Sequence, residues 1–406
     1  MNFTFLLSKK LIPKDSQRIS RPIMRISIIS VALGVSILIL AFAVTSGFKN
    51  EIKGKIIGFG SHIEVVHFDN NTSYESIPVN SDLDFYNDIR RLENVQSIQS
   101  VAEKAGIVKG EKDIEGVVFK GISKTYNASF FEKHLVKGRF IQLQDSAVSN
   151  EIIISEILAN KLHLDTGERL LAYFVQNPVR QRVFTITGIY NTGLGTHDKK
   201  TIVADIRQIQ KLNDWSENLS SGMEIILHDF DKIDQTNEQI NDILPPEMQS
   251  NTIIERNIEI FDWIDLFNQN VYVLILLIII ITTVSLISTQ LTISLEHINT
   301  VGILKTLGCT NAVIRNIFLY ISARILVYGL LFGNFIAFIL CYLQSTFKIL
   351  TLNPENYFVS FVPIELNIWH IVLINGGTVL ISLLILIVPS YFVAKKIKAI
   401  DALRME

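Results

Sequence analysis

Charged side chains are scarce over nearly half of this sequence. Of its 406 residues, 76 are Asp, Glu, Lys or Arg, and 56 of these lie between residues 48 and 268. The other 185 residues hold only 20 charged side chains, a fraction well below the roughly one quarter typical of soluble domains. This deficit excludes an ordinary soluble protein. It predicts a normally charged domain set inside a membrane protein.

Cysteine is almost absent, and neither Cys309 nor Cys341 lies in the charged central domain. That domain therefore has no thiol for a disulfide or a thiolate metal site. Its 33 acidic residues outnumber its 23 basic ones, which argues against nucleic acid as a partner because phosphate binding needs clustered Lys and Arg. The domain must fold on an apolar core, which its 221 residues can supply.

The common signatures of nucleotide binding and hydrolysis are also missing. The sequence has no Gly-x-x-x-x-Gly-Lys-Ser/Thr loop, no His-Glu-x-x-His and no Gly-x-Ser-x-Gly. His62 and His67 are close in sequence, but their odd spacing places them on opposite faces of a predicted strand. We expect no catalytic residue, metal or cofactor on this chain, so any energy it uses must come from another chain or from an ion gradient.

Four charge-free runs are long enough to cross a bilayer as helices. They predict a membrane protein with four transmembrane α-helices, one before and three after a large α+β domain. The predicted order is a cytoplasmic N-terminal segment (1–25), helix 1 (26–48), an exported domain (49–265), helix 2 with a stalk (266–295), a cytoplasmic loop helix (296–315), helix 3 (316–347), an outer loop (348–367), helix 4 (368–394) and a cytoplasmic tail (395–406).

Basic residues beside the spans predict the orientation. Six of the first 25 residues are Lys or Arg, whereas the loop between the third and fourth spans has only Lys348. Because basic flanks stay in the cytoplasm, we expect both termini and residues 296–315 to be cytoplasmic. An alternative for the first run is a signal peptide cleaved after Ala41-Phe-Ala43, which sequencing the mature N-terminus would decide.

Polar and small residues inside the spans are few. No Asp or Glu lies in a span, which argues against a gradient-driven carrier. Arg324 either lies inside the third helix or snorkels at its start. Gly329 and Gly333 stand at the spacing that lets helix backbones approach closely, either within one subunit or between two.

The exported domain alternates strand-like and helix-like patterns, which predicts the mixed α+β class. Strands are predicted at 61–67, 98–108, 114–122, 151–155, 170–175, 182–190, 201–204, 223–228 and 250–255, and helices at 82–95, 156–162, 205–212 and 232–244. Residues 257–270 are apolar at helical spacing and run without a breaker into the second span. We therefore expect one continuous helix there, able to pass movement across the membrane.

One strand pair encloses a predicted turn at Gln176-Asn-Pro-Val179, followed by Arg180-Gln-Arg182. Asn-Pro favours turn initiation. The segment is either a protruding hairpin that presents Gln and Arg to a partner or an ordinary exposed loop.

The cytoplasmic loop carries an apolar stripe of Val301, Ile303, Leu304 and Leu307, interrupted by glycines. The pattern predicts a short amphipathic helix at the membrane face. It either lies on the membrane surface without a partner or fits a groove of a motor protein.

Val301-Gly-Ile-Leu-Lys-Thr-Leu-Gly308 resembles the coupling-helix signature of the MacB/FtsX-like ABC permeases, and Ile400-Asp-Ala-Leu-Arg404 resembles the tail that closes them. Glu296-His297 and Thr300 depart from the usual family pattern, so docking to an ATPase can differ in detail. Further motifs resemble the lipoprotein-releasing permeases of the LolC/LolE type, and they are Arg21–Ser27, Ala32–Gly34, Ser46–Phe48, Gly58–Ile63, Phe119–Ile122 and Phe130–Phe131. The resemblance covers essentially the whole chain.

This resemblance implies a permease subunit in the bacterial inner membrane, paired with a second, identical or paralogous permease subunit. A separate ABC ATPase would bind ATP and Mg²⁺, and a periplasmic chaperone would accept the lipoprotein substrate that is released by mechanotransmission. The implied ATPase-coupling residues are Val301, Gly302, Ile303, Leu304, Lys305, Leu307 and Gly308. The implied chaperone contacts are Asn177, Pro178, Gln181 and Arg182, and the implied lipid entrance is Phe42, Val44, Phe48, Ile264, Phe267 and Tyr272.

Two other functions stay open. One is an FtsX-like transducer that regulates an extracytoplasmic partner, although such transducers have a much smaller exported domain. The other is a MacB-like efflux permease, which usually carries its ATPase on the same chain. A neighbouring gene for a lone ABC ATPase, together with one for a periplasmic lipoprotein chaperone, would separate the first function from the transducer.

Overall fold

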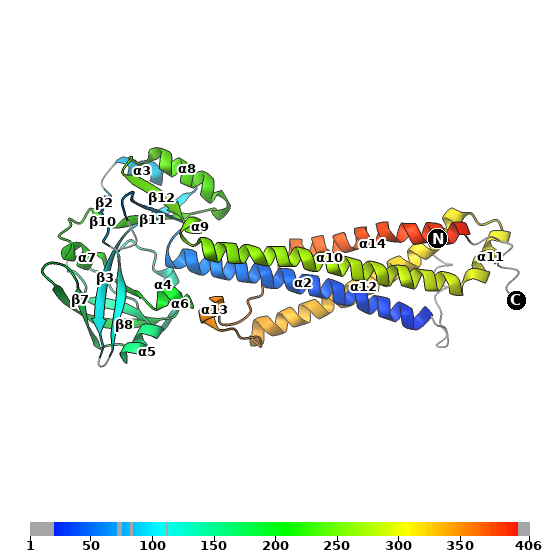
Figure 1. Cartoon of the computed structure of the whole chain (residues 1–406), viewed down its shortest axis with the longest axis horizontal. Helices are drawn as coiled ribbons and strands as arrows, with labels where there is room; N and C mark the ends of the chain where they lie inside the picture. The colour runs from blue at the N-terminus through cyan, green and yellow to red at the C-terminus, as the bar shows by residue number, and fades with distance from the viewer. Residues whose placement is uncertain (1–19, 71–74, 82–83, 111–112, 146, 397–406) are drawn as a thin grey trace. The chain divides into compact units, whose positions relative to one another are not determined.

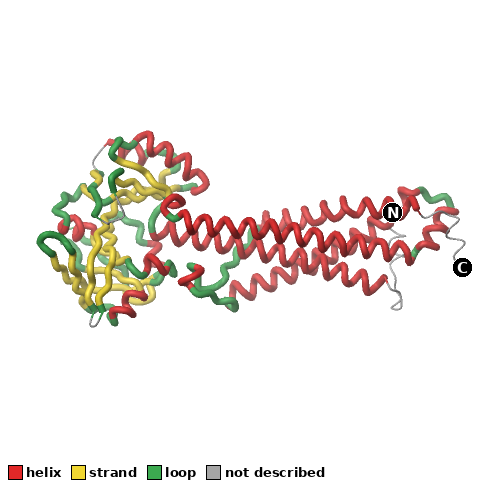
Figure 2. The backbone as a smooth tube through the Cα atoms, viewed as in Figure 1, coloured by secondary structure: helices red, strands yellow, loops and turns green. Residues whose placement is uncertain are grey.

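The computed structural model describes residues 20–70, 75–81, 84–110, 113–145 and 147–396 (Figures 1 and 2). Most of the predicted N-terminal segment (1–25) and of the tail (395–406), including the motif at 400–404, lies outside these residues. The chain divides into two compact units. Unit 1 contains residues 1–49, 263–351 and 361–406, and unit 2 contains residues 50–262 and 352–360.

Within the described residues, four helices are long and apolar enough to cross a membrane. They are α2 (Ser20–Phe59), α10 (Ile258–Glu296), α12 (Asn311–Phe347) and α14 (Ile368–Lys396). One of them precedes the α+β domain and three follow it, so the predicted fold class is confirmed. The continuous helix predicted from residue 257 onward is also confirmed, since α10 is unbroken from Ile258.

Close backbone packing joins α2 to α12 inside unit 1. A Cβ atom added to Gly329 would lie 2.6 Å from the Cβ of Val31, and one added to Gly333 would lie 2.7 Å from the carbonyl oxygen of Ala32. No larger residue fits there without moving the helices apart. The small-residue spacing therefore serves packing within the chain.

Polar side chains also connect the helices of unit 1. The amides of Asn334 on α12 and Asn375 on α14 donate to each other's oxygens at 2.7 and 3.1 Å. Ser27 of α2 bonds to Thr289 of α10 through their hydroxyl groups. Such pairs satisfy polar groups that lipid cannot hydrate and fix how the helices face one another.

Unit 2 is built on strands, drawn in yellow in Figure 2, and most of them pair in antiparallel fashion. They are β1 (Ile63–His67), β2 (Val79–Asn80), β3 (Val95–Lys109), β4 (Ile114–Ile122), β5 (Leu135–Gly138), β6 (Glu151–Ser155), β7 (Arg169–Phe174), β8 (Arg180–Tyr190), β9 (Thr201–Asp205), β10 (Leu219–Ser220), β11 (Gly222–Leu227) and β12 (Met248–Thr252). The main sheet runs β12-β1-β11-β3-β4-β9-β6-β8-β5.

Strand β7 closes part of that sheet on itself, because it pairs with both β3 and β8. The closed ring of strands surrounds the main apolar core. Phe119 of β4, Phe174 of β7 and Phe184 of β8 meet there, with ring centroids 5.1 and 5.2 Å from Phe119. These rings lie within a larger cluster of buried apolar side chains, and burial of that cluster stabilises unit 2.

Short helices cover the sheet and connect its strands. They are α3 (Asp84–Arg90), α4 (Ser129–Lys133), α5 (Glu156–Leu162), α6 (Gly195–Asp198), α7 (Ile206–Leu212), η1 (Phe230–Lys232), α8 (Ile233–Ile243), α9 (Ile253–Arg256) and α13 (Pro354–Tyr357). Side-chain caps begin two of the longer ones, since Ser155 accepts a hydrogen bond from the backbone of Leu158 and Asp205 accepts one from Arg207.

The strand predicted at 250–255 is wrong in its second half. The strand β12 ends at Thr252, and α9 begins at Ile253. Thr252 and Glu255 form a capping box, in which each side chain accepts a hydrogen bond from the other residue's backbone N–H. The Thr-x-x-Glu spacing that builds such a box is visible in the sequence and outweighs the β-branched residues between them. The helix predicted at 82–95 is also shorter, since α3 ends at Arg90.

Candidate functional site

The predicted coupling segment folds as α11 (Ile298–Thr306), a helix separate from α10 and α12. Val301 and Gly302 are buried, whereas Ile303 is 56% exposed and Leu307 is 76% exposed. Leu304 and Lys305 are half-buried. Two large apolar side chains thus project from one short helix and its end.

Gly308 ends this helix in the left-handed region, at φ +86°. Its backbone N–H donates to the carbonyl of Lys305 at 3.0 Å, and that of Cys309 donates to Leu304 at 3.0 Å. Only glycine adopts this backbone without strain. The glycine in the motif therefore sets where α11 stops and how Leu307 projects.

The predicted turn joins β7 and β8 as a hairpin of unit 2. Asn177, Pro178 and Gln181 are exposed, and Arg182 is half-buried. Val179 is 60% exposed. The hairpin end thus offers both polar and apolar side chains to solvent.

Arg180 holds this hairpin in place. Its guanidinium donates to the carbonyl oxygens of Lys211 and Leu212 at 2.8 and 2.9 Å, and it pairs with Asp214 at 2.7 Å. These acceptors lie at the end of α7, where backbone carbonyls have no helical partner. Arg180 therefore positions the hairpin, whereas Gln181 is exposed and the guanidinium of the half-buried Arg182 donates only to the carbonyl of Gln181 at 2.9 Å among the bonds of the described residues.

Residues predicted to line a lipid entrance lie on α2 and α10 in unit 1. The structure brings two of them together, because the rings of Phe48 and Phe267 stack with centroids 5.5 Å apart. Phe42 instead lies 5.3 Å from the ring of His370 on α14. Val44 is half-buried, and the two remaining residues of the set are buried Ile264 and exposed Tyr272.

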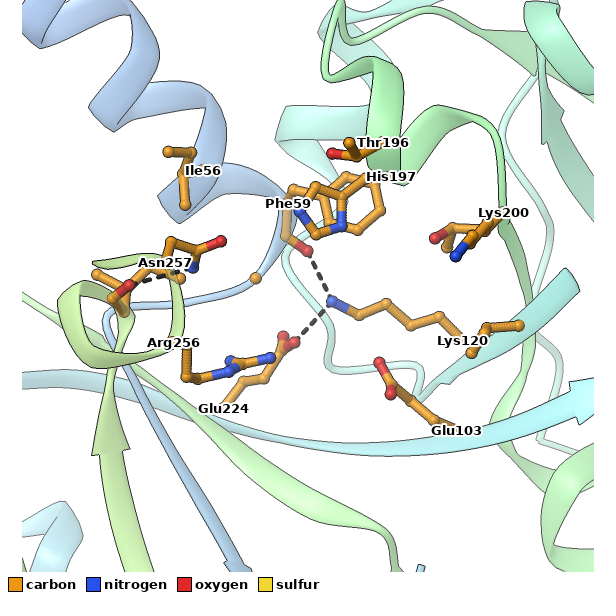
Figure 3. A pocket seen from close by; sticks show the side chains of 14 residues that line it. Ile56, Phe59, Glu103, Lys120, Thr196, His197, Lys200, Glu224, Arg256 and Asn257 are labelled. Atoms are coloured by element: carbon orange, nitrogen blue, oxygen red, sulfur yellow. Dashed lines mark hydrogen bonds and ion pairs between the residues drawn. The ribbon is translucent and has the colours of Figure 1, made fainter. Parts of the chain in front are cut away.

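Unit 2 also contains a cluster of charged side chains, two of them buried, that no sequence motif marks (Figure 3). Lys120 of β4 and Glu224 of β11 are each 3% exposed and form an ion pair of 2.6 Å. Arg256, at the end of α9, pairs with Glu64 of β1 at 3.0 Å. We call Lys120, Glu224, Glu64 and Arg256 the junction cluster.

A cavity of about 310 Å³ opens beside the junction cluster. Phe59, His197 and Glu103 contribute to its lining, and Figure 3 shows Lys120 extending between Glu224 and the backbone of Phe59. One oxygen of Glu224, Oε2, is buried without a hydrogen-bond partner in the described part of the chain. The site is thus polar on one side and aromatic on the other.

Burial and charge shift the titration of the groups in this cavity. Burial raises the pKa of Glu224 to about 7, while Lys120 opposes that rise. Burial also acts to lower the pKa of Lys120, but the neighbouring Glu224 outweighs it and the pKa of Lys120 stays above its usual value. The shift of the Lys120 pKa favours its charged form. Removing only one partner of such a pair costs about 3–5 kcal/mol, because a buried charge is left alone.

A sequence signal for this cluster exists. Glu224 is the only charge in the apolar strand β11, and Lys120 directly follows the apolar run Val117–Phe119 of β4, so both charges stand among residues expected to be buried. An inward-facing charge requires a partner of opposite sign. The partner of each charge depends on the order of the strands in the sheet. The sequence alone could therefore indicate these residues but could not predict their pairing.

The chain matches two family descriptions over most of its length. Residues 26–243 match the MacB-like periplasmic core domain, and residues 272–396 match the FtsX-like permease C-terminal domain.

Relatives with curated names match over nearly their full length. The lipoprotein-releasing system transmembrane protein LolC of Neisseria meningitidis serogroup B is 24% identical, over 94% of each chain. LolC of Buchnera aphidicola subsp. Schizaphis graminum is 24% identical over 91% of this chain and 90% of its own. LolE of Haemophilus influenzae is 23% identical over 92% of each chain.

Four apolar helices and the two matched domains define a multi-pass membrane permease of the ABC-transporter class, in the bacterial inner membrane. Within that class, the chain belongs to the family of FtsX-like permeases that carry a MacB-like periplasmic core domain.

Proposed function

We propose that this chain is a permease subunit of a transporter that releases lipoproteins from the inner membrane to a periplasmic chaperone. The observation that carries the proposal is the match to LolC over 94% of both chains, which spans the helices, the inserted domain and the coupling segment together. A match confined to one domain would fit any member of the family.

Docking of a separate ABC ATPase is assigned to α11. Ile303 and Leu307 are large, exposed apolar side chains at this helix, and such side chains fit a hydrophobic groove on a partner. ATP and Mg²⁺ would be bound by that ATPase and not by this chain. The basic residues around the spans favour a cytoplasmic position for α11 and both termini.

Mechanical coupling is assigned to α2 and α10. Each is a single unbroken helix whose residues belong to both units, with α2 ending at Phe59 and α10 beginning at Ile258. A continuous helix has no hinge at which movement is lost. Movement of α11 on nucleotide binding would therefore reach unit 2 through these helices.

The lipid chains of the substrate are assigned to the surface around Phe48 and Phe267. These stacked rings lie on α2 and α10, the two helices next to the predicted entrance. A second permease subunit, identical or paralogous, would complete the entrance. Release to the chaperone is assigned to the exposed end of the β7–β8 hairpin, at Asn177, Pro178, Gln181 and Arg182.

Reconstitution of the complex tests this function. The chain would be placed in proteoliposomes with its ATPase, its partner permease and an acylated lipoprotein. We expect soluble lipoprotein only when ATP and the periplasmic chaperone are both present. Release without ATP, or no release under any condition, would contradict the proposal. Nucleotide-stimulated activity without release would instead favour a transducer.

A variant pair makes the same assay specific for α11. Leu307→Asp should abolish nucleotide-dependent release because a charge replaces the apolar contact with the ATPase. Ile114→Asp is the matched control, since Ile114 is 64% exposed and lies on β4 in the other unit. Equal loss in both variants would argue against a docking role for Leu307.

A further inference from the structure

The junction cluster lies at both helix ends that reach unit 2. The helix α2 ends at Phe59, and α10 begins at Ile258, immediately after Arg256 and Asn257. Lys120 contacts the end of α2 at Phe59, and Arg256 belongs to the segment that leads into α10. The cluster is therefore placed where movement of either helix would first meet the sheet.

Lys120 holds the end of α2. The last carbonyl groups of a helix have no helical donor and carry a partial negative charge. The last turn of α2 contains no basic residue of its own. The ammonium group of Lys120, which comes from β4, donates to the carbonyl oxygen of Phe59 at 2.7 Å. A cation from the sheet thus caps the helix.

Arg256 holds the start of α10. It is the last residue of α9, and its guanidinium lies 3.0 Å from the carboxylate of Glu64 on β1. The backbone N–H of Ile253, at the start of α9, donates to the carbonyl of His62 at 2.9 Å. Side-chain and backbone bonds therefore tie this helix entry to β1.

The two contacts share one face of the sheet. Glu64 and Glu224 stand directly opposite each other on the antiparallel strands β1 and β11. Two carboxylates in such a position repel unless cations neutralise them. Arg256 pairs with Glu64, and Lys120 pairs with Glu224. The ends of α2 and α10 are therefore linked through one cluster, in which two cations neutralise two facing carboxylates.

We propose that the junction cluster is the joint through which α2 and α10 act on unit 2, and that Lys120 is a positioning residue for this coupling. This inference rests on the proposed function, in which helix movement drives release. It assigns a task to Lys120 that does not involve contact with lipoprotein, ATPase or chaperone.

The experiment compares Lys120→Met, Lys120→Arg and the double variant Lys120→Met with Glu224→Met in the full complex. The double variant removes both partners of the buried ion pair together, so it avoids the cost of leaving the Glu224 carboxylate without Lys120. Lys124→Met is the control, because Lys124 follows β4 and forms an exposed pair with Asp145 at 2.7 Å.

Two quantities are measured. The first is the hydrogen exchange rate of the amides at residues 56–60, including Gly60, whose N–H donates to Ile56 at 3.0 Å. The second is lipoprotein released per ATP hydrolysed. In the double variant we expect exchange about tenfold faster and release per ATP about tenfold lower, since one charge-assisted hydrogen bond to the helix end is lost. Lys120→Arg, which keeps a donor, should restore both.

The two readouts separate this inference from the proposed function. If the wild-type complex releases no lipoprotein, the proposed function fails, and the exchange rate still decides whether Lys120 holds the end of α2. If the double variant exchanges and releases like the wild type, the junction role is overturned. If ATP hydrolysis and lipoprotein release by the double variant both fell in proportion to the fraction of folded protein, Lys120 would have a structural role only. That result would also overturn the junction role.

Discussion

The two units place similar side chains in opposite environments. In unit 2, Phe119 and Phe184 are each 1% exposed at the centre of the closed ring of strands. In unit 1, Phe332 and Phe335 of α12 are 54% and 63% exposed. Unit 2 is stabilised by removing apolar area from water, whereas unit 1 can expose such area because lipid replaces water around it.

The polar groups that the two units bury also differ. Unit 2 buries charged residues such as Lys120 and Glu224 as an ion pair. Unit 1 joins its helices with neutral pairs such as Asn334 and Asn375. A charge costs far more than an amide in a medium without water, so the spans use neutral polar contacts. The comparison teaches that environment, and not side-chain type, decides what each unit can bury.

Truncation of a core aromatic ring should give the largest effect. Phe119→Ala removes a ring that contacts Phe174 and Phe184, and we expect the free energy of unfolding to fall by about 3–5 kcal/mol. Phe335→Ala removes an equal ring from the exposed face of α12 and should change it by less than about 0.5 kcal/mol. Denaturation of both variants in detergent measures the difference. Similar losses in the two would break the comparison between the units.

Acid should destabilise unit 2 through His62. The ring is 9% exposed, and its Nδ1 accepts a hydrogen bond from the backbone of Leu227 at 3.1 Å, so it is neutral. Burial, with a smaller effect of Lys53, lowers the pKa of His62 from 6.5 to about 4. The unfolded chain therefore takes up this proton first as the pH falls. Stability due to His62 is complete above pH 6.5 and is lost as the pH falls through about 4.

The size of this acid effect follows from the lowered pKa of His62. Between pH 7 and pH 4.5, wild type should lose on the order of 2–3 kcal/mol more than His62→Gln, which cannot titrate. Thermal unfolding of both proteins at a series of pH values measures this difference. Parallel pH profiles for the two would mean that His62 does not carry the acid sensitivity.

A smaller effect should come from the helix contact in unit 1. Gly333→Ala places a Cβ atom 2.7 Å from the carbonyl oxygen of Ala32, and we expect a loss of about 1–3 kcal/mol because α2 and α12 must separate. Gly376→Ala on α14 meets nothing within 4 Å. It should be neutral or stabilise the helix by up to about 1 kcal/mol. Thermal midpoints in detergent measure this ranking. If Gly376→Ala lowered the midpoint more than Gly333→Ala, close packing of α2 on α12 would not be the main contact of unit 1.

Much of the fold could be predicted because its signals are local. Charge-free runs marked the four long helices, and period-two patterns marked most strands of unit 2, such as β4 and β6. The segment after Thr252 was predicted wrongly because β-branched residues mask a capping box. The small-residue pattern at Gly329 and Gly333 could not choose between packing within and between chains, since both require the same spacing.

The candidate site was predictable only in part, because only some of its residues are neighbours in the sequence. The exposed residues of α11 and of the hairpin belong to short contiguous segments, so a sequence motif contains them. The junction cluster draws Lys120, Glu224 and Arg256 from three separate elements. Arg180 is adjacent in sequence to the predicted chaperone contacts Gln181 and Arg182, but it bonds to the end of α7, which is close only after folding.

The sequence by itself determined the membrane helices, the inserted α+β domain and the continuity of α10, because hydrophobicity and backbone propensity act over neighbouring residues. Only the tertiary structure decided that β7 closes the strand ring, that Gly333 meets Ala32, and that one lysine joins a helix end to a buried carboxylate. These contacts depend on which strands and helices become neighbours, and that choice is made by the packing of the whole chain.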